Sequence, residues 1–300
     1  MTHIDTLPQS QIKTISIVYD ENMTVEKFFL DIFGWSKQFY KKQGFPRSWS
    51  EQLVKGKYSY AIPIEAINHG KIRVADSGFL HKVKVIAEND LIAAIYKDEK
   101  IHSHPLNYSE TDNTLSILLL NGRDDLLQIN TTQYDRGLLY RLDYETSGLL
   151  LIAKNIETYQ YIRHNFSSVM LQKMYRLKCH GKLQFDTGHW MHWILPAGKS
   201  KSKMTALSLP DKKRESTQAE LSFKVIDYDE VQNISEVEVF LKTGMRHQIR
   251  VQFATMGHPI VGDELYSGMN ADRLYLHAYQ YTLVLDNNEM SFTAELPPNW

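Results

Sequence analysis

Apolar and polar positions follow two different periods along this chain, and the change between them predicts two parts. Between residues 24 and 42 apolar side chains recur every three or four positions, as on one face of an amphipathic helix with Thr24 as its N-cap. Residues 66–78 (AINHGKIRVADSG) predict the end of a helix, a glycine turn and a short strand. We interpret residues 1–84 as an N-terminal extension with a small α/β subdomain.

From residue 82 onward, alternating segments and short apolar runs dominate, and both patterns are typical of strands. The predicted strands are 148–153, 174–180, 219–227, 235–242 and 279–285, and the predicted helices are 156–168 and 246–256. Strands outnumber helices, and several are joined by short turns. This favours an α+β fold with a mixed, mostly antiparallel sheet and flanking helices. We expect this main domain to cover residues 85–300, with a polar loop at 195–216.

Composition limits the size of the core, the way a polyanion could bind and the cellular compartment. A chain of 300 residues with 43% hydrophobic content can bury a sizeable core. The 34 Lys and Arg nearly cancel the 35 Asp and Glu, so a polyanion would have to be held by local basic clusters. A single cysteine, Cys179, excludes an intramolecular disulfide and fits a reducing compartment. Residues 1–13 lack a secretory pattern and no apolar stretch reaches about 18 residues, so we expect a cytoplasmic protein away from membranes.

One stretch, RLDYETSGLLLIAK (141–154), sets charged and hydroxyl side chains directly in front of an apolar run. Asp143 therefore lies in a loop that leads into a buried strand. Taken alone, the stretch favours a turn in which Asp143, Thr146 and Ser147 bond to loop amides. A second stretch, LKTGMRHQIRVQF (241–253), predicts a strand, a glycine turn and a helix that carries Arg250. An arginine on the first turns of a helix can reach a loop carboxylate and hold it ionised as a nucleophile.

Four motifs in a fixed order give the chain its family likeness. It resembles the RluA-type pseudouridine synthases, and the resemblance covers most of residues 87–300. The matching stretches are YRLDYETSGLLLIAKN, LQKMYRLKCHG (171–181), LKTGMRHQIRVQF, and GHPIVGDELY with RLYLHAYQYTL (273–283).

This resemblance implies an enzyme that isomerises uridine to pseudouridine in structured ribosomal or transfer RNA, with no cofactor and no metal. It implies that Asp143 is the nucleophile, that Tyr175 stacks on the base and removes its carbon-bound proton, and that Arg250 ion-pairs with Asp143. The target uridine would be flipped out of its stack, and Arg141 would fill the gap.

Other positions are expected to contact the RNA, and some of them depart from the family pattern. These RNA-binding candidates are Arg141, Tyr144, Arg246, His247 and Gln248. Tyr140 and Tyr144 stand where the family has a histidine and a basic residue, and Met245 with Arg246 replaces the usual arginine position. Because Arg250 keeps its spacing, we expect the aspartate's partner to survive and the phosphate contact to move. The helix and turn within residues 1–84 faintly resemble a small RNA-binding module.

Two other classes of function fit the sequence less well. A catalytically silent RNA-binding protein on the same fold would not need Asp143, Tyr175 and Arg250 together. A metal-dependent hydrolase would need clustered ligands, whereas His189 and His192 have no third ligand near them in sequence and fit a packed aromatic strand or turn. We expect RNA as the partner, no membrane, no metal and a monomer.

Overall fold

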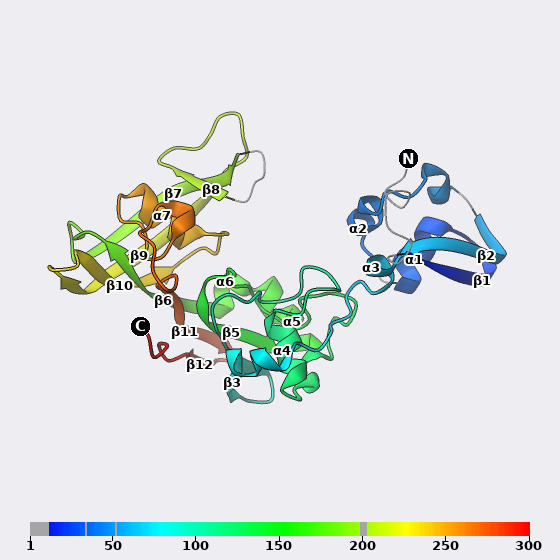
Figure 1. Cartoon of the computed structure of the whole chain (residues 1–300), viewed down its shortest axis with the longest axis horizontal. Helices are drawn as coiled ribbons and strands as arrows, with labels where there is room; N and C mark the ends of the chain where they lie inside the picture. Colours follow the sequence, from blue (N-terminus) through cyan, green and yellow to red (C-terminus); the bar gives the residue numbers. More distant parts are fainter. Residues whose placement is uncertain (1–11, 34, 52, 199–202) are drawn as a thin grey trace. The chain divides into compact units, whose positions relative to one another are not determined.

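The computed structural model describes residues 12–33, 35–51, 53–198 and 203–300. Figure 1 labels its helices and strands. Its contacts divide the chain into two compact units. Unit 1 comprises the chain up to Asp76 together with His104–Arg136, and unit 2 comprises Ser77–Ser103 and Gly137–Trp300.

Unit 1 is built on a long antiparallel pair of strands, β1 (Ile12–Thr24) and β2 (Leu53–Pro63). Between them run α1 (Val25–Phe33), α2 (Lys37–Lys42) and the 3-10 helix η3 (Arg47–Ser50), and α3 (Ile64–Ile67) follows β2. The Thr24 hydroxyl accepts a hydrogen bond from the Lys27 amide at 3.2 Å. The helix cap predicted from the sequence is therefore confirmed.

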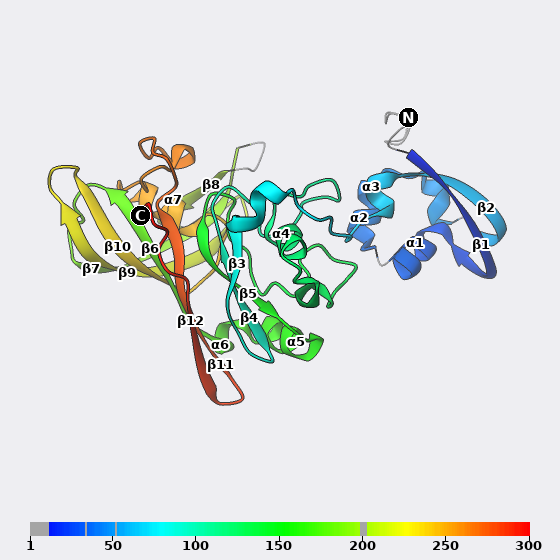
Figure 2. The same cartoon turned by 60° about the horizontal axis from the view of Figure 1, so that its bottom comes forward.

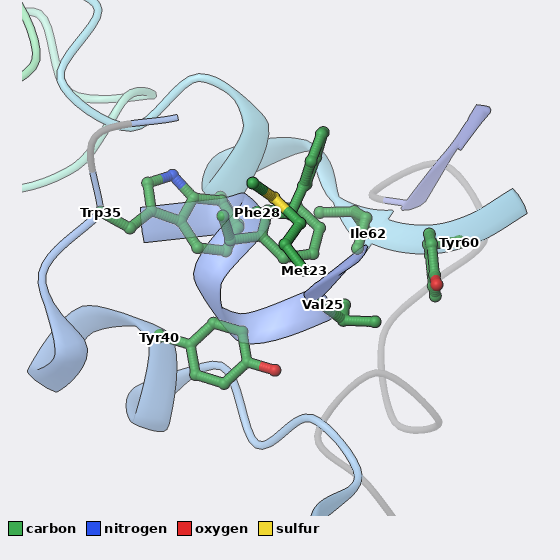
Figure 3. Packing of buried hydrophobic residues seen from close by; sticks show 9 residues of the cluster. Met23, Val25, Phe28, Trp35, Tyr40, Tyr60 and Ile62 are labelled. Carbon is green, nitrogen blue, oxygen red and sulfur yellow. The ribbon is translucent and has the colours of Figure 1, made fainter. Parts of the chain in front are cut away.

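The core of this unit is rich in aromatic rings. Met23, Val25, Phe28 and Ile62 gather with Trp35 between the helices and β2 (Figure 3). The rings of Phe29 and Trp35 stack at 4.6 Å between centroids. The apolar spacing of residues 24–42 thus forms a buried face, but on two helices instead of one.

Residues 104–136 add a second segment to unit 1. It contains α4 (Thr114–Leu120), capped by the Asn113 side chain, and the 3-10 helix η5 (Asp124–Leu127). At its end the Arg136 guanidinium donates to the carbonyl of Gly70 at 2.6 Å. Gly70 has φ +78°, and a Cβ there would lie 2.3 Å from the Thr132 carbonyl oxygen. A glycine is required at this close approach.

Unit 2 contains a ten-stranded sheet within the described residues, in the order β3-β4-β5-β11-β6-β10-β9-β7-β8 with β12 paired to β11 (Figure 2). The β5–β11 pair is parallel and the other pairs are antiparallel. Its strands are β3 (Val83–Glu88), β4 (Ile92–Lys97), β5 (Ser147–Ala153), β6 (Met170–His180), β7 (Thr187–Ala197), β8 (Lys203–Leu207), β9 (Thr217–Asp229), β10 (Ile234–Leu241), β11 (Leu276–Leu285) and β12 (Asn288–Thr293). The helices are α5 (Ile156–His164), α6 (Phe166–Val169) and α7 (Gln248–Thr255), with 3-10 turns η4 (Ser77–Lys82) and η6 (Glu264–Tyr266).

The α+β class with a mixed, mostly antiparallel sheet is confirmed, and each predicted strand of the main domain is present. Three details differ. The short strand expected within residues 66–78 does not form, because the Ala75 amide bonds to the Ser116 carbonyl at 3.2 Å instead of to a strand. The expected polar loop at 195–216 contains β8, and its residues 199–202 lie outside the described ones. The compact units divide at Asp76/Ser77, before the expected boundary, and residues 104–136 group with unit 1.

At the centre of the sheet, β5 and β11 lie in close contact. All residues of β5 are buried, as its apolar run predicts. Gly148 in this strand has φ +116°, and a Cβ there would lie 2.3 Å from the Ala278 carbonyl oxygen of β11. The parallel pair β5–β11 can therefore close only because residue 148 is glycine.

Candidate active site

One open pocket, with an empty volume of about 380 Å³, lies within unit 2. Its wall combines the loop before β5, the middle of β6, the start of β11 and the turn that joins β10 to α7. The lining residues from these segments are Arg141, Leu142, Asp143, Thr146, Tyr175, Leu241, Met245, His247, Gln248, Ile249, Arg250 and Leu276. The pocket thus brings together stretches that are far apart in the sequence.

A charged pair lies in this pocket. The Arg250 Nη1 and Asp143 Oδ2 atoms are 3.5 Å apart. The arginine side chain is only 3% exposed, whereas the aspartate is 23% exposed. The carboxylate therefore remains accessible from the pocket while its cationic partner is buried behind it.

Arg250 has a tighter partner that the sequence reasoning missed. Its Nε and Nη2 atoms each bond to an oxygen of Asp263 at 2.8 Å, and the Asp263 side chain is fully buried. Glu145 approaches Nη1 at 3.2 Å from the more exposed side. Burial alone would lower the pKa of Arg250, but the hydrogen bonds and charge of Asp263 raise it above its ordinary value. The forked pair with Asp263 fixes the plane of the guanidinium.

Tyr175 enters the pocket from β6 with a buried ring. Its hydroxyl forms a hydrogen bond with the hydroxyl of Tyr281 on β11. Burial raises the pKa of the Tyr175 phenol above its ordinary value, and the negative charge of Asp143 adds to the rise, while the bond to Tyr281 opposes it. The group is thus a neutral phenol with a flat apolar face.

The turn between β10 and α7 is held by its own side chains together with those of Tyr266 and Lys173. His247 adopts a left-handed conformation (φ 55°, ψ 20°) just before the helix, and its Nδ1 lies 3.0 Å from the Tyr266 hydroxyl. The Gln248 amide oxygen accepts from the Thr243 hydroxyl at 2.9 Å, and its nitrogen donates to the Glu220 carbonyl at 3.0 Å. Lys173 donates to the Thr243 carbonyl at 2.9 Å. These bonds fix where α7 begins and therefore where Arg250, in its first turn, points.

The loop that carries Asp143 is fastened on both sides of that residue. Ser103 bonds through its hydroxyl to both the amide and the carbonyl of Leu142, at 2.9 and 3.0 Å. The ammonium of Lys97, fully buried, donates to the carbonyls of Asp98 and Ile101 at 2.9 Å and approaches that of Tyr144 at 3.4 Å. Burial lowers the pKa of Lys97 to about 7, against the opposing charge of Asp143. The backbone around the aspartate is therefore held in place before any ligand binds.

Comparison with known proteins identifies the family. Residues 91–255 match the family described as RNA pseudouridylate synthase. The chain belongs to this family. The resemblance to RluA-type pseudouridine synthases found in its motifs is thereby confirmed. The relatives of this chain are named pseudouridine synthases, and enzymes of that name are isomerases.

Individual relatives agree with this family membership. An uncharacterised RNA pseudouridine synthase of Aquifex aeolicus is 30% identical over 239 residues, which cover 74% of this chain and 72% of that protein. The ribosomal large subunit pseudouridine synthase D of Borreliella burgdorferi is 26% identical over 220 residues, which cover 72% of this chain and 65% of that protein. The structure of human RNA pseudouridylate synthase domain containing 1 shares the fold, with a TM-score of 0.58 and 19% identity over 74% of this chain and 86% of that one.

The pocket in unit 2 brings together most of the residues predicted for the site. Asp143, Tyr175, Arg250, Arg141, His247 and Gln248 line it, whereas Tyr144 and Arg246 are not among its lining residues. Tyr144 is 40% exposed, with its ring 4.8 Å from that of His102. Arg246 is exposed, and its Nη2 approaches the Met204 sulfur at 3.2 Å. Arg141 is exposed at the pocket.

Two residues of the site, Asp263 and Tyr281, could have been suspected from the sequence only weakly. Asp263 ends the glycine-bounded GHPIVGD turn, and Tyr281 follows the LHA stretch in a strand where it would be read as core. Within the described residues, no group of three or more His, Cys, Asp or Glu is placed to hold a metal ion. His192 instead bonds to the Gln252 amide at 3.0 Å. No helix in the described part of the chain is long and apolar enough to span a membrane.

Proposed function

We propose that this chain converts uridine to pseudouridine in structured RNA of the ribosomal or transfer class. The observation that carries the proposal is the meeting of Asp143, Tyr175 and Arg250 in one pocket of a pseudouridylate synthase fold. The reaction breaks the bond from uracil N1 to ribose and forms a bond from C5 to ribose. The C5 proton leaves and N1 gains a proton, so atoms and charges balance without an oxidant or reductant.

Asp143 is the nucleophile in this proposal. Its carboxylate is partly exposed to the pocket, and the loop around it is already ordered by Ser103 and Lys97. Arg250 orients the carboxylate, and Asp263 fixes Arg250 in turn. A preformed arrangement of this kind reduces the reorganisation needed when the substrate arrives.

Tyr175 supplies a flat face for the uracil and a hydroxyl that relays the C5 proton. Its oxygen takes that proton as its own hydroxyl proton passes on towards uracil N1, so the phenol remains neutral. Its ring lines the same pocket as Asp143, so both groups can reach one bound base. Because a uridine stacked in folded RNA cannot enter a pocket, the base must flip out, which costs a few kcal/mol. Arg141, exposed beside the pocket, fills the gap that the base leaves.

The first experiment uses total RNA from cells that lack the gene, labelled with tritium at uridine C5. Wild-type protein should release tritium and form pseudouridine, also in EDTA, because the proposed chemistry uses no metal. Asp143→Ala and the isosteric Asp143→Asn should release none, since both lack the nucleophile. Both variants should keep their affinity for the RNA within about tenfold, because the lost group contributes little to holding phosphates.

Each rival function gives a different result in the same assay. A catalytically silent RNA-binding protein would bind the RNA and release no tritium from it. A metal-dependent hydrolase would shorten the RNA and stop in EDTA. Full activity of Asp143→Ala would overturn the proposed role of Asp143.

A further inference from the structure

Tyr281 stands directly behind the proposed proton-accepting tyrosine. It is fully buried on β11, it does not line the pocket, and its hydroxyl is hydrogen-bonded to that of Tyr175. The two ring centroids are 5.8 Å apart. A hydroxyl deep in a protein core needs a partner, and here each phenol supplies one to the other.

A β-bulge is what brings these two hydroxyls together. In the antiparallel pair of β11 and β6, Ala278 opposes Tyr175, but Gln280 opposes Met174, so Tyr279 is an extra residue on β11. Tyr281 consequently opposes Lys173, which lies on the same face of β6 as Tyr175. Without the extra residue Tyr281 would face the other side of the sheet. Bulges commonly re-aim a side chain next to an active site.

The far side of Tyr281 is closed by another tyrosine. The Tyr140 ring packs against it at 4.7 Å between centroids, and the Tyr140 hydroxyl donates to the Leu149 carbonyl at 3.2 Å. Tyr140 therefore anchors on β5, while the Tyr281 hydroxyl bonds to Tyr175. The two phenols belong to one cluster but have different partners.

We propose that Tyr281 is a positioning residue for the isomerisation, which acts by fixing the direction of the Tyr175 O–H bond so that a lone pair of the Tyr175 oxygen faces the uracil C5 proton. This inference rests on the proposed function. A tyrosine ring is fixed along its long axis by packing, but its hydroxyl is directed by its hydrogen-bond partner. Loss of that partner leaves the Tyr175 ring and its oxygen in the pocket but frees the O–H bond to rotate, so that no lone pair of the oxygen is kept towards C5. Binding of the base would then persist while proton removal slows.

The test compares two matched variants, each of which loses one buried phenol hydroxyl. Tyr281→Phe should lower kcat about tenfold, the usual effect of losing one oriented hydrogen bond, with KM for the RNA unchanged. The kinetic isotope effect from deuterium at uridine C5 should increase, because C5 proton removal now limits the rate more strongly. Tyr140→Phe loses a bond to a backbone carbonyl and should keep both the wild-type kcat and the wild-type isotope effect.

Several outcomes would overturn the inference. One is a Tyr281→Phe protein with wild-type kcat and isotope effect. Another is an equal fall in kcat for both variants with an unchanged isotope effect, since that would indicate packing alone. If wild-type protein makes no pseudouridine, the proposed function fails and takes this inference with it. If wild-type protein is active and Tyr281→Phe has the same kcat and isotope effect, the inference fails while the proposed function stands. Urea midpoints of both variants verify that the compared proteins are folded.

Discussion

At the residue scale, the site depends on one buried guanidinium shared by three carboxylates of unequal exposure. Asp263 is fully buried, Asp143 is partly exposed and Glu145 is 44% exposed. A buried charge that loses its partner is strongly destabilising, whereas an exposed pair contributes little. Asp263 is therefore expected to matter most for stability although it does not touch the substrate pocket.

Asp263→Asn should lower the free energy of unfolding by about 3 kcal/mol, because it leaves the Arg250 charge buried with a neutral partner. It should also slow pseudouridine formation, since Arg250 then loses its fixed plane beside Asp143. Glu145→Gln is the same chemical change on the exposed partner and should cost less than about 1 kcal/mol. Urea unfolding of both variants measures this; a larger loss for Glu145→Gln would contradict the ranking.

The residues of the site differ in how far the sequence could predict them. Asp143, Tyr175 and Arg250 carry family motifs, so the resemblance named them; their catalytic roles stay predictions. Asp263 and Tyr281 act through partners that only the folded turn and the bulge bring near. A sequence does not show which arginine a buried aspartate will meet.

At the element scale, the contact between β5 and β11 controls the position of the loop that carries Asp143. Gly148→Ala should lower the free energy of unfolding by about 3 kcal/mol or more, because it adds both backbone strain at φ +116° and a clash with the Ala278 carbonyl. Gly257 also has a positive φ, but nothing lies within 4 Å of a Cβ built there. Gly257→Ala should therefore cost only about 1 kcal/mol of strain. Equal losses in urea unfolding would refute the clash.

The elements themselves were predictable where a pattern was strong and local. The apolar run of β5 and the alternation in β10 gave their strands directly. β8 was hidden in a polar segment, because only Met204 and Ala206 of its five residues are buried. The strand expected in residues 66–78 does not form because no strand in the described part of the chain pairs with it; Val74 there is 56% exposed.

At the scale of the whole molecule, a buried polar chain joins segments from distant parts of unit 2. The Ala294 carbonyl can only accept, so His277 carries its proton on Nε2 and accepts from Ser147 on Nδ1. Ser147 in turn accepts from Arg273, which pairs with Glu99 at 3.1 Å. These bonds hold the beginning of β5 to β11 and to Ala294, the residue directly after β12.

The buried histidine in this series of hydrogen bonds predicts how the free energy of unfolding depends on pH. Burial lowers the pKa of His277 to about 4, from 6.5. Between these values the unfolded chain binds a proton that the folded protein does not, so stability falls as the pH falls. From pH 6.5 to 4 the wild type should lose about 3 kcal/mol of unfolding free energy more than His277→Asn. Urea unfolding across this range, with His258→Asn as the control on a half-buried histidine, tests it; parallel curves would contradict it.

The division of the whole chain was the hardest feature to predict. The change from helical to strand-like apolar spacing predicts a boundary near residue 85. That this boundary separates an RNA-binding subdomain from a catalytic domain stays a prediction. The return of residues 104–136 to unit 1 has no local signal, because their apolar helix α4 would fit the core of either unit. Only contacts such as that between Arg136 and the Gly70 carbonyl decide the matter.

That interleaving has a consequence for synthesis on the ribosome. Unit 1 is complete only when Arg136 has emerged, because its last segment follows β3 and β4, which belong to the other unit. Those two strands therefore leave the exit tunnel before unit 1 is complete and before β5, the neighbour of β4, exists. The nascent chain therefore carries β4 without its neighbour β5 until the last segment of unit 1 has been made, and an unpaired strand edge of this kind is a site that a chaperone would protect.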